Sequence, residues 1–579
     1  MFKDAIYLMY ILSHKNRKQN HLQKLNLKTP TMQIRFFTAK TLLWGLALLP
    51  FVAVAQVKRQ AQSVPRRDTR PVEVAVFSIN DFHGAFIASP EKGIAGAAAV
   101  CETLDSLKKV YPFHLTVSAG DNFGGSYFYK VTGGQLMPLF FHEAGIRLSA
   151  LGNHEFDDGQ DALAAKWADS PLRPKDWDMT YVCANVRNTA TGTLPSCVSA
   201  SALTEVNLPG GKKLPVAFAG LLTSAAPHQV SARRVKGLCF DGRYDVVLDS
   251  LLATPEGKAL AAAPLRLLLA HIGTTTNAEG QPVWDDPDAE ALTKLRPGDW
   301  HGFFSSHTHQ KVRGHINKNR MPVVQGLWHA DYISALIFSI DTTNLDVVGV
   351  KPCLFPVTQR RITSPGARRL QHVTDSLLLH TTIGGLPLSE HLTTLPEALI
   401  HRRNQNDLQT ELGTLVTRAY ENAFRRNAHC GMQDVVIGCS HFGSIRAALP
   451  KGEVTVLDAG EALPFANKLR AYSLTGRQLR DLVEYGLRCP LGRIQLSSLE
   501  VKTDGAGHVK KLVAALPSGK KVKLKDKQNY VLVVDEYMTT GGDGYNPSFF
   551  PEAQEVTTEN MPTTTDSFIQ YLKEIGKGK

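Results

Sequence analysis

Side chains that bind metal ions in proteins stand at the ends of five apolar runs within residues 71–309. Each run has the composition of a strand, and the polar residues at or just past the ends are Asp81 and His83; Asp121; Asn153 and His154; His271; His307 and His309. An Asp-x-His or His-x-His pair places two side chains on one side of an extended segment, as chelation requires. One His after a strand is more often an ordinary loop residue, yet five such ends in one block favour a shared metal site.

The donor atoms indicate which metals would bind. With His154 set aside, seven nitrogen and oxygen ligands without a thiolate suit Zn, Mn, Fe or Co, and no Cys-x-x-Cys pair is present for a structural zinc. Two ions ~3.5–4 Å apart must share a carboxylate. Asp121 stands alone at its strand end and is the candidate bridge, so the set predicts two divalent metal ions.

His154 has neighbours that suit acid–base chemistry. It follows Asn153 directly and stands three residues before Asp157. An Asn oxygen can complete a metal shell without adding charge, and the adjacent imidazole could then face a ligand on that metal. Asp157 would fix the ring and favour its protonated form. We therefore predict catalytic roles for His154 and Asp157.

A fold that gathers strand ends is needed to bring these residues together. A strand over 71–80 precedes an Ala-rich helix over 96–110, and further apolar runs over 265–270 and 302–305 precede the later His residues. Strands that alternate with helices indicate an α/β fold, in which polar residues past the strand ends meet at one edge of a sheet.

The remainder of the chain shows a linker and a second block. Residues 357–400 are rich in Arg, Ser and Leu with helical spacing, and we predict that they form a linker. A helix over 474–487 with Ser473 as its cap and a strand over 530–535 that runs into a glycine-rich loop belong to the second block. At 579 residues the chain is too long for one core, so two domains are expected.

The positive charge of the chain is unevenly distributed. The formal net charge is +12, but residues 1–55 hold eight Lys or Arg against the single acid Asp4. About +5 remains over the following 524 residues. Bulk charge therefore gives no reason to expect a nucleic acid polymer as partner.

Residues 1–55 have the composition of an upstream extension and a signal peptide. Met32 is a second possible start, followed by Arg35 and Lys40, an apolar run over 41–55 and a small-x-small site before Gln56. Roughly 15 apolar residues fall short of the ~20 that span a membrane. We predict an exported protein, periplasmic or extracellular, with no stable membrane span after cleavage.

The eight cysteines leave two alternatives open. All of them lie beyond residue 100, and Cys183 with Cys197 and Cys430 with Cys439 are close enough in sequence to pair. The count permits disulfides without showing any, and buried free thiols are the alternative.

Taken in order, these motifs resemble those of the calcineurin-like metallophosphoesterases. The segments Asn80 to Gly84 and Gly152 to Gly159 resemble in amino-acid sequence the corresponding motifs of the 5′-nucleotidase and UDP-sugar hydrolase branch. The resemblance implies a four-layer α/β sandwich over 71–356, the linker over 357–400 and a smaller α+β substrate-binding domain over 401–575. We refer to the two domains as the first and second blocks.

The resemblance also implies how the metals would be held. One ion would be bound by Asp81, His83, Asp121 and His309, and the other by Asp121, Asn153, His271 and His307. His154, paired with Asp157, would stabilise the transition state or protonate the leaving oxygen. One departure is Ser306, where the family usually has Gly; a Ser fits there unless φ is positive.

In the second block fewer residues match the motifs of the family. Phe465 and Tyr545 stand in segments like those whose rings hold a nucleobase, and Gly443 with Arg446 matches the end of a substrate-binding motif. His441 stands where that motif has Asn, and Leu408 stands where an Arg is expected. Stacking tolerates many bases, so we predict a broad enzyme with a weakened hold on the charged end of its substrate.

Together these features predict an exported dinuclear phosphatase that hydrolyses nucleotide phosphate esters with metal-activated water. The alternatives are hydrolysis of a UDP-sugar, a cyclic nucleotide or another organophosphate, or a nucleotide-binding protein that has lost its activity. The expected partner in every case is a small phosphorylated molecule.

Overall fold

The computed structural model describes residues 71–89, 93–277, 281–316, 321–383, 385–401, 409–428, 431, 433–489, 492–504 and 506–577. The expected extension and signal peptide, Leu408 and Cys430 lie outside these residues. Asp68–Lys579 form one compact unit. No helix in the described part of the chain is long and apolar enough to cross a membrane.

The first sheet carries the strands that lead to Asp81, Asp121 and Asn153. In spatial order its strands are β17 (Val347–Pro356), β16 (Tyr332–Ile340), β1 (Val72–Ile79), β2 (His114–Ser118), β3 (Ile146–Ala150), β4 (Thr180–Val182) and β6 (Val198–Ser199). β1, β2, β3, β4 and β6 run parallel, whereas β16 and β17 are antiparallel to their neighbours.

The second sheet carries the strands that lead to His271 and the His307–His309 segment. Its spatial order is β14 (Lys311–His315), β15 (Pro322–Gly326), β13 (Gly302–Phe304), β10 (Leu265–His271), β8 (Lys213–Leu222) and β7 (Ser201–Asn207). β15, β13, β10 and β8 are parallel, so their carboxyl ends point to one edge.

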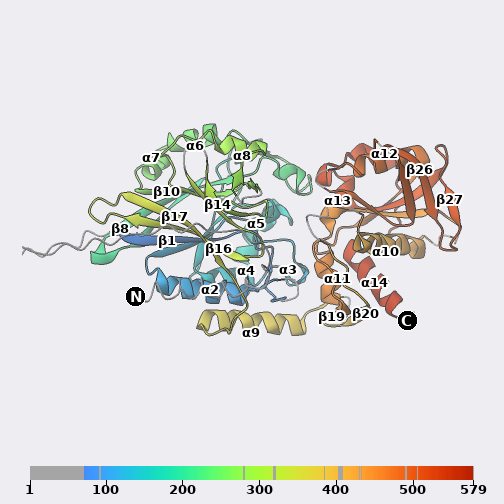
Figure 1. Ribbon diagram of the computed structural model, residues 1–579, viewed down its shortest axis with the longest axis horizontal. Coiled ribbons are helices and arrows are strands. Elements are labelled where there is room, and N and C mark those ends of the chain that lie inside the picture. The colour runs from blue at the N-terminus through green and yellow to red at the C-terminus, as the bar shows by residue number, and fades with distance from the viewer. Residues whose placement is uncertain are drawn as a thin grey trace, which may run out of the picture. The chain divides into compact units, whose positions relative to one another are not determined.

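The two sheets pack face to face and are covered by helices. Val74, Val76 and Phe218 are fully buried in the core between the sheets. The helices outside the first sheet are α2 (Ala97–Val110), α4 (Met137–Ala144) and α9 (Pro365–His380), and those outside the second are α6 (Tyr244–Leu252), α7 (Pro255–Ala261) and α8 (Pro287–Leu292). Figure 1 shows α2 and α9 below the strands and α6 to α8 above them. The predicted α/β four-layer sandwich is confirmed.

Residues assigned to the linker join this outer layer. Helix α9 packs against α2 and α4, and its Ala367 and Leu370 are fully buried. Glu102 of α2 accepts hydrogen bonds from the backbone N–H groups of Thr363 (2.9 Å) and Ser364 (2.8 Å). The start of α9 is therefore fastened to the first block.

The second block is α+β. Its mixed sheet runs β23 (Leu469–Thr475), β28 (Asn529–Asp535), β21 (Val436–His441) and β24 (Ile494–Leu496), with α10 (Glu411–Asn427), α11 (Val456–Ala462), α12 (Gly476–Gly486) and α14 (Thr564–Lys577) around it. β25 (Leu499–Thr503), β26 (Val509–Ala515) and β27 (Lys521–Lys523) form a separate small antiparallel sheet.

One local expectation needs correction, and the structure decides between the two alternatives for several cysteines. Helix α12 is capped by Thr475, whose side chain and Gln478 form a capping box, and not by Ser473, which is still inside β23. Cys183 and Cys197 are free thiols, the first buried and the second exposed, so they form no disulfide. Cys439, which is close to Cys430 in sequence, is also a free thiol and is buried.

Candidate metal centre and substrate cavity

The seven predicted metal ligands lie together where the carboxyl ends of both sheets meet. Asp81 and His83 follow β1, Asp121 follows β2 and Asn153 follows β3. From the second sheet come His271, the last residue of β10, and His307 and His309, which follow β13. Parallel strands place residues past their ends at one sheet edge, and this packing brings two such edges together.

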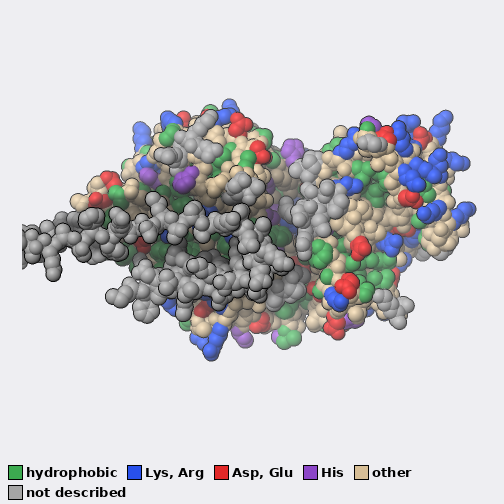
Figure 2. Space-filling view, in the orientation of Figure 1, with side chains coloured by type: hydrophobic (Ala, Val, Ile, Leu, Met, Phe, Trp, Pro, Cys, Tyr) green, Lys and Arg blue, Asp and Glu red, His purple; other side chains and the backbone are tan. Residues whose placement is uncertain are grey.

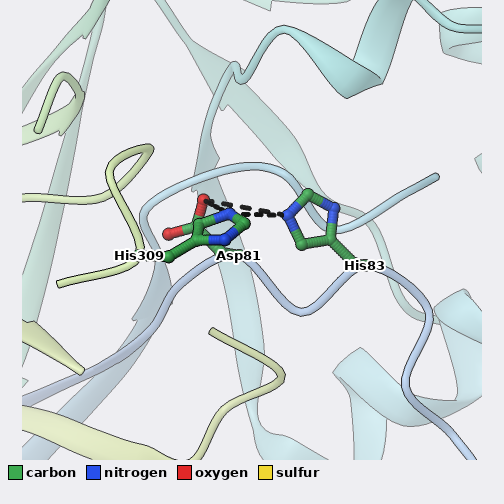
Figure 3. A group of neighbouring side chains, drawn as sticks. All are labelled: Asp81, His83 and His309. Carbon is green, nitrogen blue, oxygen red and sulfur yellow. Dashed lines mark hydrogen bonds and ion pairs between the residues drawn. The ribbon is translucent and has the colours of Figure 1, made fainter. Parts of the chain in front are cut away.

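One group of ligands comprises Asp81, His83 and His309. The Nε2 atoms of His83 and His309 are 3.0 Å apart, and Nε2 of His309 lies 3.3 Å from Oδ1 of Asp81. Figure 3 shows the three side chains converging on one point. Two imidazole nitrogens at this distance repel unless a proton or a metal ion lies between them, so the group suits a cation.

A second group comprises Asp121, His271 and His307, and a third, formed by His83, Asp121 and His154, overlaps both. Nε2 of His271 lies 3.1 Å from Oδ2 of Asp121, and the same oxygen lies 3.9 Å from Nε2 of His83 in the first group. Asp121 therefore reaches both groups, as a bridging carboxylate must. Oδ1 of Asn153 is buried and has no hydrogen-bond partner among the described residues, which leaves an acceptor for a metal ion.

The electrostatics of the buried groups also suit cations. Burial raises the pKa of the Asp81 carboxyl to about 6. Burial lowers the pKa of His271, but the Asp121 carboxylate outweighs that effect and brings the pKa to about 9. The Asp121 carboxylate thus favours a positive charge beside His271, and a divalent ion bound there would supply one. The chemistry and placement of the donors fit two metal ions.

The backbone is strained at most of the ligands. Five of the seven have a positive φ: Asp81 (47°), His83 (51°), Asp121 (53°), His307 (78°) and His309 (54°). Such conformations cost about 1–3 kcal/mol each for non-glycine residues and persist only where surrounding contacts hold them. At these five residues the chain turns past its strand ends into the site.

Glu155 supplies much of that support. It is fully buried and accepts hydrogen bonds from the backbone N–H groups of Asp121 (3.0 Å), Asn122 (2.9 Å) and Gly152 (2.7 Å). Burial and the nearby Asp121 carboxylate raise the pKa of Glu155 to about 7. A Cβ on Gly152 would lie 2.3 Å from Oδ1 of Asp121, so only glycine fits there.

Two further residues support the ligands without belonging to the predicted set. Nδ2 of Asn80 donates to Oδ2 of Asp81 at 2.8 Å, and Oδ1 of Asn80 accepts from the N–H of Gly326 at 2.9 Å. Oγ of Ser306 donates to the carbonyl of Ala119 at 2.7 Å and lies 2.9 Å from Nδ1 of His271. The φ of Ser306 is not positive, so the replacement of Gly is accommodated.

His154 lies beside the ligands with its ring fixed by Asp157. Nδ1 of His154 is 2.8 Å from Oδ2 of Asp157, and its backbone N–H donates to Oδ1 of Asp121 at 2.9 Å. Burial lowers the pKa of His154, but Asp157 and Asp121 together raise it above its usual value. The ring can thus hold a proton next to the candidate metal site.

A cavity of about 920 Å³ opens over this centre and is lined by residues of both blocks. His154 and Asp121 line it from the first block, and Phe465, Arg446 and His441 from the second. The rings of His154 and Phe465 are stacked, with centroids 6.0 Å apart and 7° between their planes. The guanidinium of Arg446 lies 5.7 Å from the centre of the Phe465 ring.

The role predicted for Tyr545 needs correction. Its ring is 1% exposed in the core of the second block, and its hydroxyl donates to the carbonyl of Gly492 at 2.7 Å. Tyr545 is not among the residues that line the cavity, whereas Tyr537 is. The glycine-rich turn at 541–544 directs the chain inward before Tyr545, which sequence spacing does not reveal.

His441, the replacement for Asn, is held by protein groups. Its Nδ1 lies 2.8 Å from Oδ2 of Asp543 and its Nε2 lies 2.5 Å from Oγ of Ser444. The hydroxyl of Tyr537 donates to Oδ1 of the same Asp543 at 3.1 Å. His441 thus helps to position Asp543 and Tyr537. A Cβ on Gly443 would lie 2.3 Å from Oδ2 of Asp543, which excludes a side chain there.

The model of the 5′-nucleotidase C-terminal domain matches residues 389–549. These residues therefore resemble a 5′-nucleotidase C-terminal domain. The resemblance to the 5′-nucleotidase family is thereby confirmed. The structure is also similar to that of a 5′-nucleotidase precursor from Thermus thermophilus, with a TM-score of 0.66 and 21% identity over 87% of this chain and 97% of that one.

Two curated relatives are similar to most of the chain, including the residues outside 389–549. Endonuclease YhcR of Bacillus subtilis is 25% identical over 543 residues, which are 88% of this chain and 41% of the relative. Cell wall protein Lmo0130 of Listeria monocytogenes is 26% identical over 560 residues, 88% of this chain and 67% of the relative. The chain thus spans about two fifths of the first relative.

Replacing Asp121 tests the shared ligand. We expect Asp121→Ala to lose both metal ions, because both ligand groups depend on this carboxylate, whereas Asp157→Asn should keep them. Metal per chain is measured by plasma mass spectrometry after gel filtration. A full metal content in Asp121→Ala would contradict the bridging role.

Proposed function

We propose that the chain is an exported phosphatase with two metal ions that hydrolyses the phosphate esters of nucleotides. The observation that supports this most is the convergence of Asp81, His83, Asp121, Asn153, His271, His307 and His309 beneath a cavity that the 5′-nucleotidase domain also lines. The name of the Listeria relative, a cell wall protein, supports export.

The charges around the cavity favour a phosphorylated substrate. Asp157, Asp158, Glu536 and Asp543 line it, and each forms an ion pair with a basic residue or a histidine. Arg233 and Arg234 also line it, and no ion pair joins either of them to another described residue. The cavity therefore presents uncompensated positive charge to a ligand.

Different residues of the chain would serve different steps of phosphate ester hydrolysis. Metal ions at such a centre neutralise phosphoryl oxygens and lower the pKa of a water molecule toward ~7. His154, which Asp157 orients through Nδ1, presents Nε2 to the departing oxygen and donates a proton to it. Arg446 supplies positive charge on the second-block side of the cavity. Phe465 and Tyr537 offer ring faces for the base.

The other candidate activities share this machinery. Hydrolysis of a UDP-sugar, a cyclic nucleotide or another organophosphate would depend on the same metal ligands. These substrates differ in the part of the molecule that the second block would bind. The rival is a nucleotide-binding protein without activity. The intact ligand groups and the His154–Asp157 pair favour an active enzyme, and phosphate release from an aryl phosphate with added divalent metal separates the two.

Replacing His154 tests its role as an acid. We expect His154→Ala to keep both metals while kcat for a nucleoside monophosphate falls by roughly 10²–10⁴. The loss should be much smaller for nitrophenyl phosphate, because nitrophenolate leaves without a proton. Initial rates on both substrates and metal content are the measurements. Equal losses on the two substrates would show that His154 does not serve the leaving group.

Replacing the cavity rings tests recognition of the base. We expect Phe465→Ala and Tyr537→Ala each to raise KM for nucleotides by roughly 5- to 150-fold, since a stacked face is worth ~1–3 kcal/mol. Hydrolysis of a small phosphate ester without a ring should barely change. Tyr545→Phe, which keeps the buried ring, is the control and should leave both KM values unaltered. Unchanged nucleotide KM in both alanine variants would mean that the substrate is not a nucleotide.

A further inference from the structure

The excess positive charge of the chain beyond residue 55 lies in one small sheet. Residues 499–528, which contain β25, β26 and β27, hold eight lysines, no arginine and three acids. Their formal net charge of +5 equals the whole excess of the chain after residue 55, so the other residues beyond 55 sum to zero. Figure 2 shows Lys and Arg side chains gathered over the elements that Figure 1 labels β26 and β27.

Cross-strand register places four of these lysines on one face. Lys502 of β25 pairs with Lys511 of β26, and Lys521 and Lys523 of β27 pair with Ala515 and Val513. These residues alternate with Leu512 and Ala514, which are buried in the core of the second block. The face made by Lys502, Lys511, Lys521 and Lys523, here called the lysine face, therefore points away from that core.

Few acids neutralise this region. Glu500 pairs with Lys502 and Lys521, and Asp504 pairs with Lys510. The third acid, Asp526, pairs with Arg477 and Arg480 of α12 instead. No ion pair joins the remaining five lysines to another described residue: Lys511, Lys520, Lys523, Lys525 and Lys527.

The chemistry of the face limits what can bind. Residues 499–528 contain no Phe, Tyr or Trp, so the face has no ring on which a base could stack. The absence of arginine also removes the bidentate contacts that recognise individual phosphates or base edges. Lysines act as point charges on flexible stems, which suits a diffuse anionic surface better than one defined ligand.

We propose that the lysine face docks the protein on a lipid bilayer with anionic headgroups. Adjacent strands are about 4.8 Å apart and alternate residues about 6.6 Å apart, so the ammonium groups spread in two dimensions, as a planar surface requires and a linear polymer does not. Clusters of four to eight basic residues at a membrane surface bind acidic lipids in this way. The lysine residues do not line the substrate cavity, so docking leaves it open. This inference does not depend on the proposed activity.

Vesicle sedimentation tests the docking. The chain from Gln56 onward, which keeps every described element, is mixed with vesicles of phosphatidylcholine alone or with 30% phosphatidylglycerol, at low salt and at 0.5 M NaCl. We expect binding to the anionic vesicles only, and only at low salt. The variant K502Q/K511Q/K521Q/K523Q should bind roughly 1,000-fold more weakly, since each lysine near the surface contributes about 1 kcal/mol.

A matched variant separates the lysine face from total charge. K109Q/K175Q/K258Q/K294Q removes the same charge from exposed lysines of the first block and should bind as the unmodified chain does. Unchanged thermal melting would show that both variants fold. Equal binding by the two variants, or no preference for anionic vesicles, would overturn the proposal. Tighter binding to heparin or double-stranded DNA than to anionic vesicles would also overturn it, in favour of a polymer.

Discussion

The crowding of buried ligand atoms around Asp121 is the constraint on which the rest of the first block depends. Asp81, Asp121 and Glu155 are each at most 2% exposed, and imidazole nitrogens stand within 3–4 Å of the first two. Carboxylates and imidazoles out of water are costly unless compensated by opposite charge. Two divalent ions would supply that charge and so allow these polar groups to share a buried site.

The backbone at the strand ends adopts unusual φ angles around these crowded side chains. Strand ends bend into left-handed conformations to aim Asp81, His83 and Asp121 at one point, and hydrogen bonds from Asn80 and to Glu155 hold them there. Stacked sheets provide two converging edges, so ligands from β1, β2 and β3 meet ligands from β10 and β13. The second block adds Phe465, whose ring stacks on that of His154, and charged side chains that line the same cavity.

Most of the fold and the proximity of the candidate ligands could be predicted from the sequence, because each depends on local patterns. Apolar runs that end in Asp, Asn or His mark strands with their carboxyl ends at a site, and the α/β sandwich is confirmed. Glu155 lies in the same segment as His154, yet its role depends on its distance to Asp121, which sequence does not encode locally. The error at Tyr545 has the same cause, since Tyr537 and Tyr545 flank one glycine turn and only the folded chain decides which of them faces the cavity. Ser473 and Thr475 are both suitable caps, and the length of β23 selects the second.

Electron paramagnetic resonance of the manganese-loaded protein tests the central claim most directly. Two Mn²⁺ ions bridged by the Asp121 carboxylate would lie ~3.5–4 Å apart, close enough for their spins to couple. The account predicts the spectrum of an exchange-coupled pair once about two ions are bound per chain. A spectrum of isolated Mn²⁺ ions in a fully active, fully loaded enzyme would contradict it.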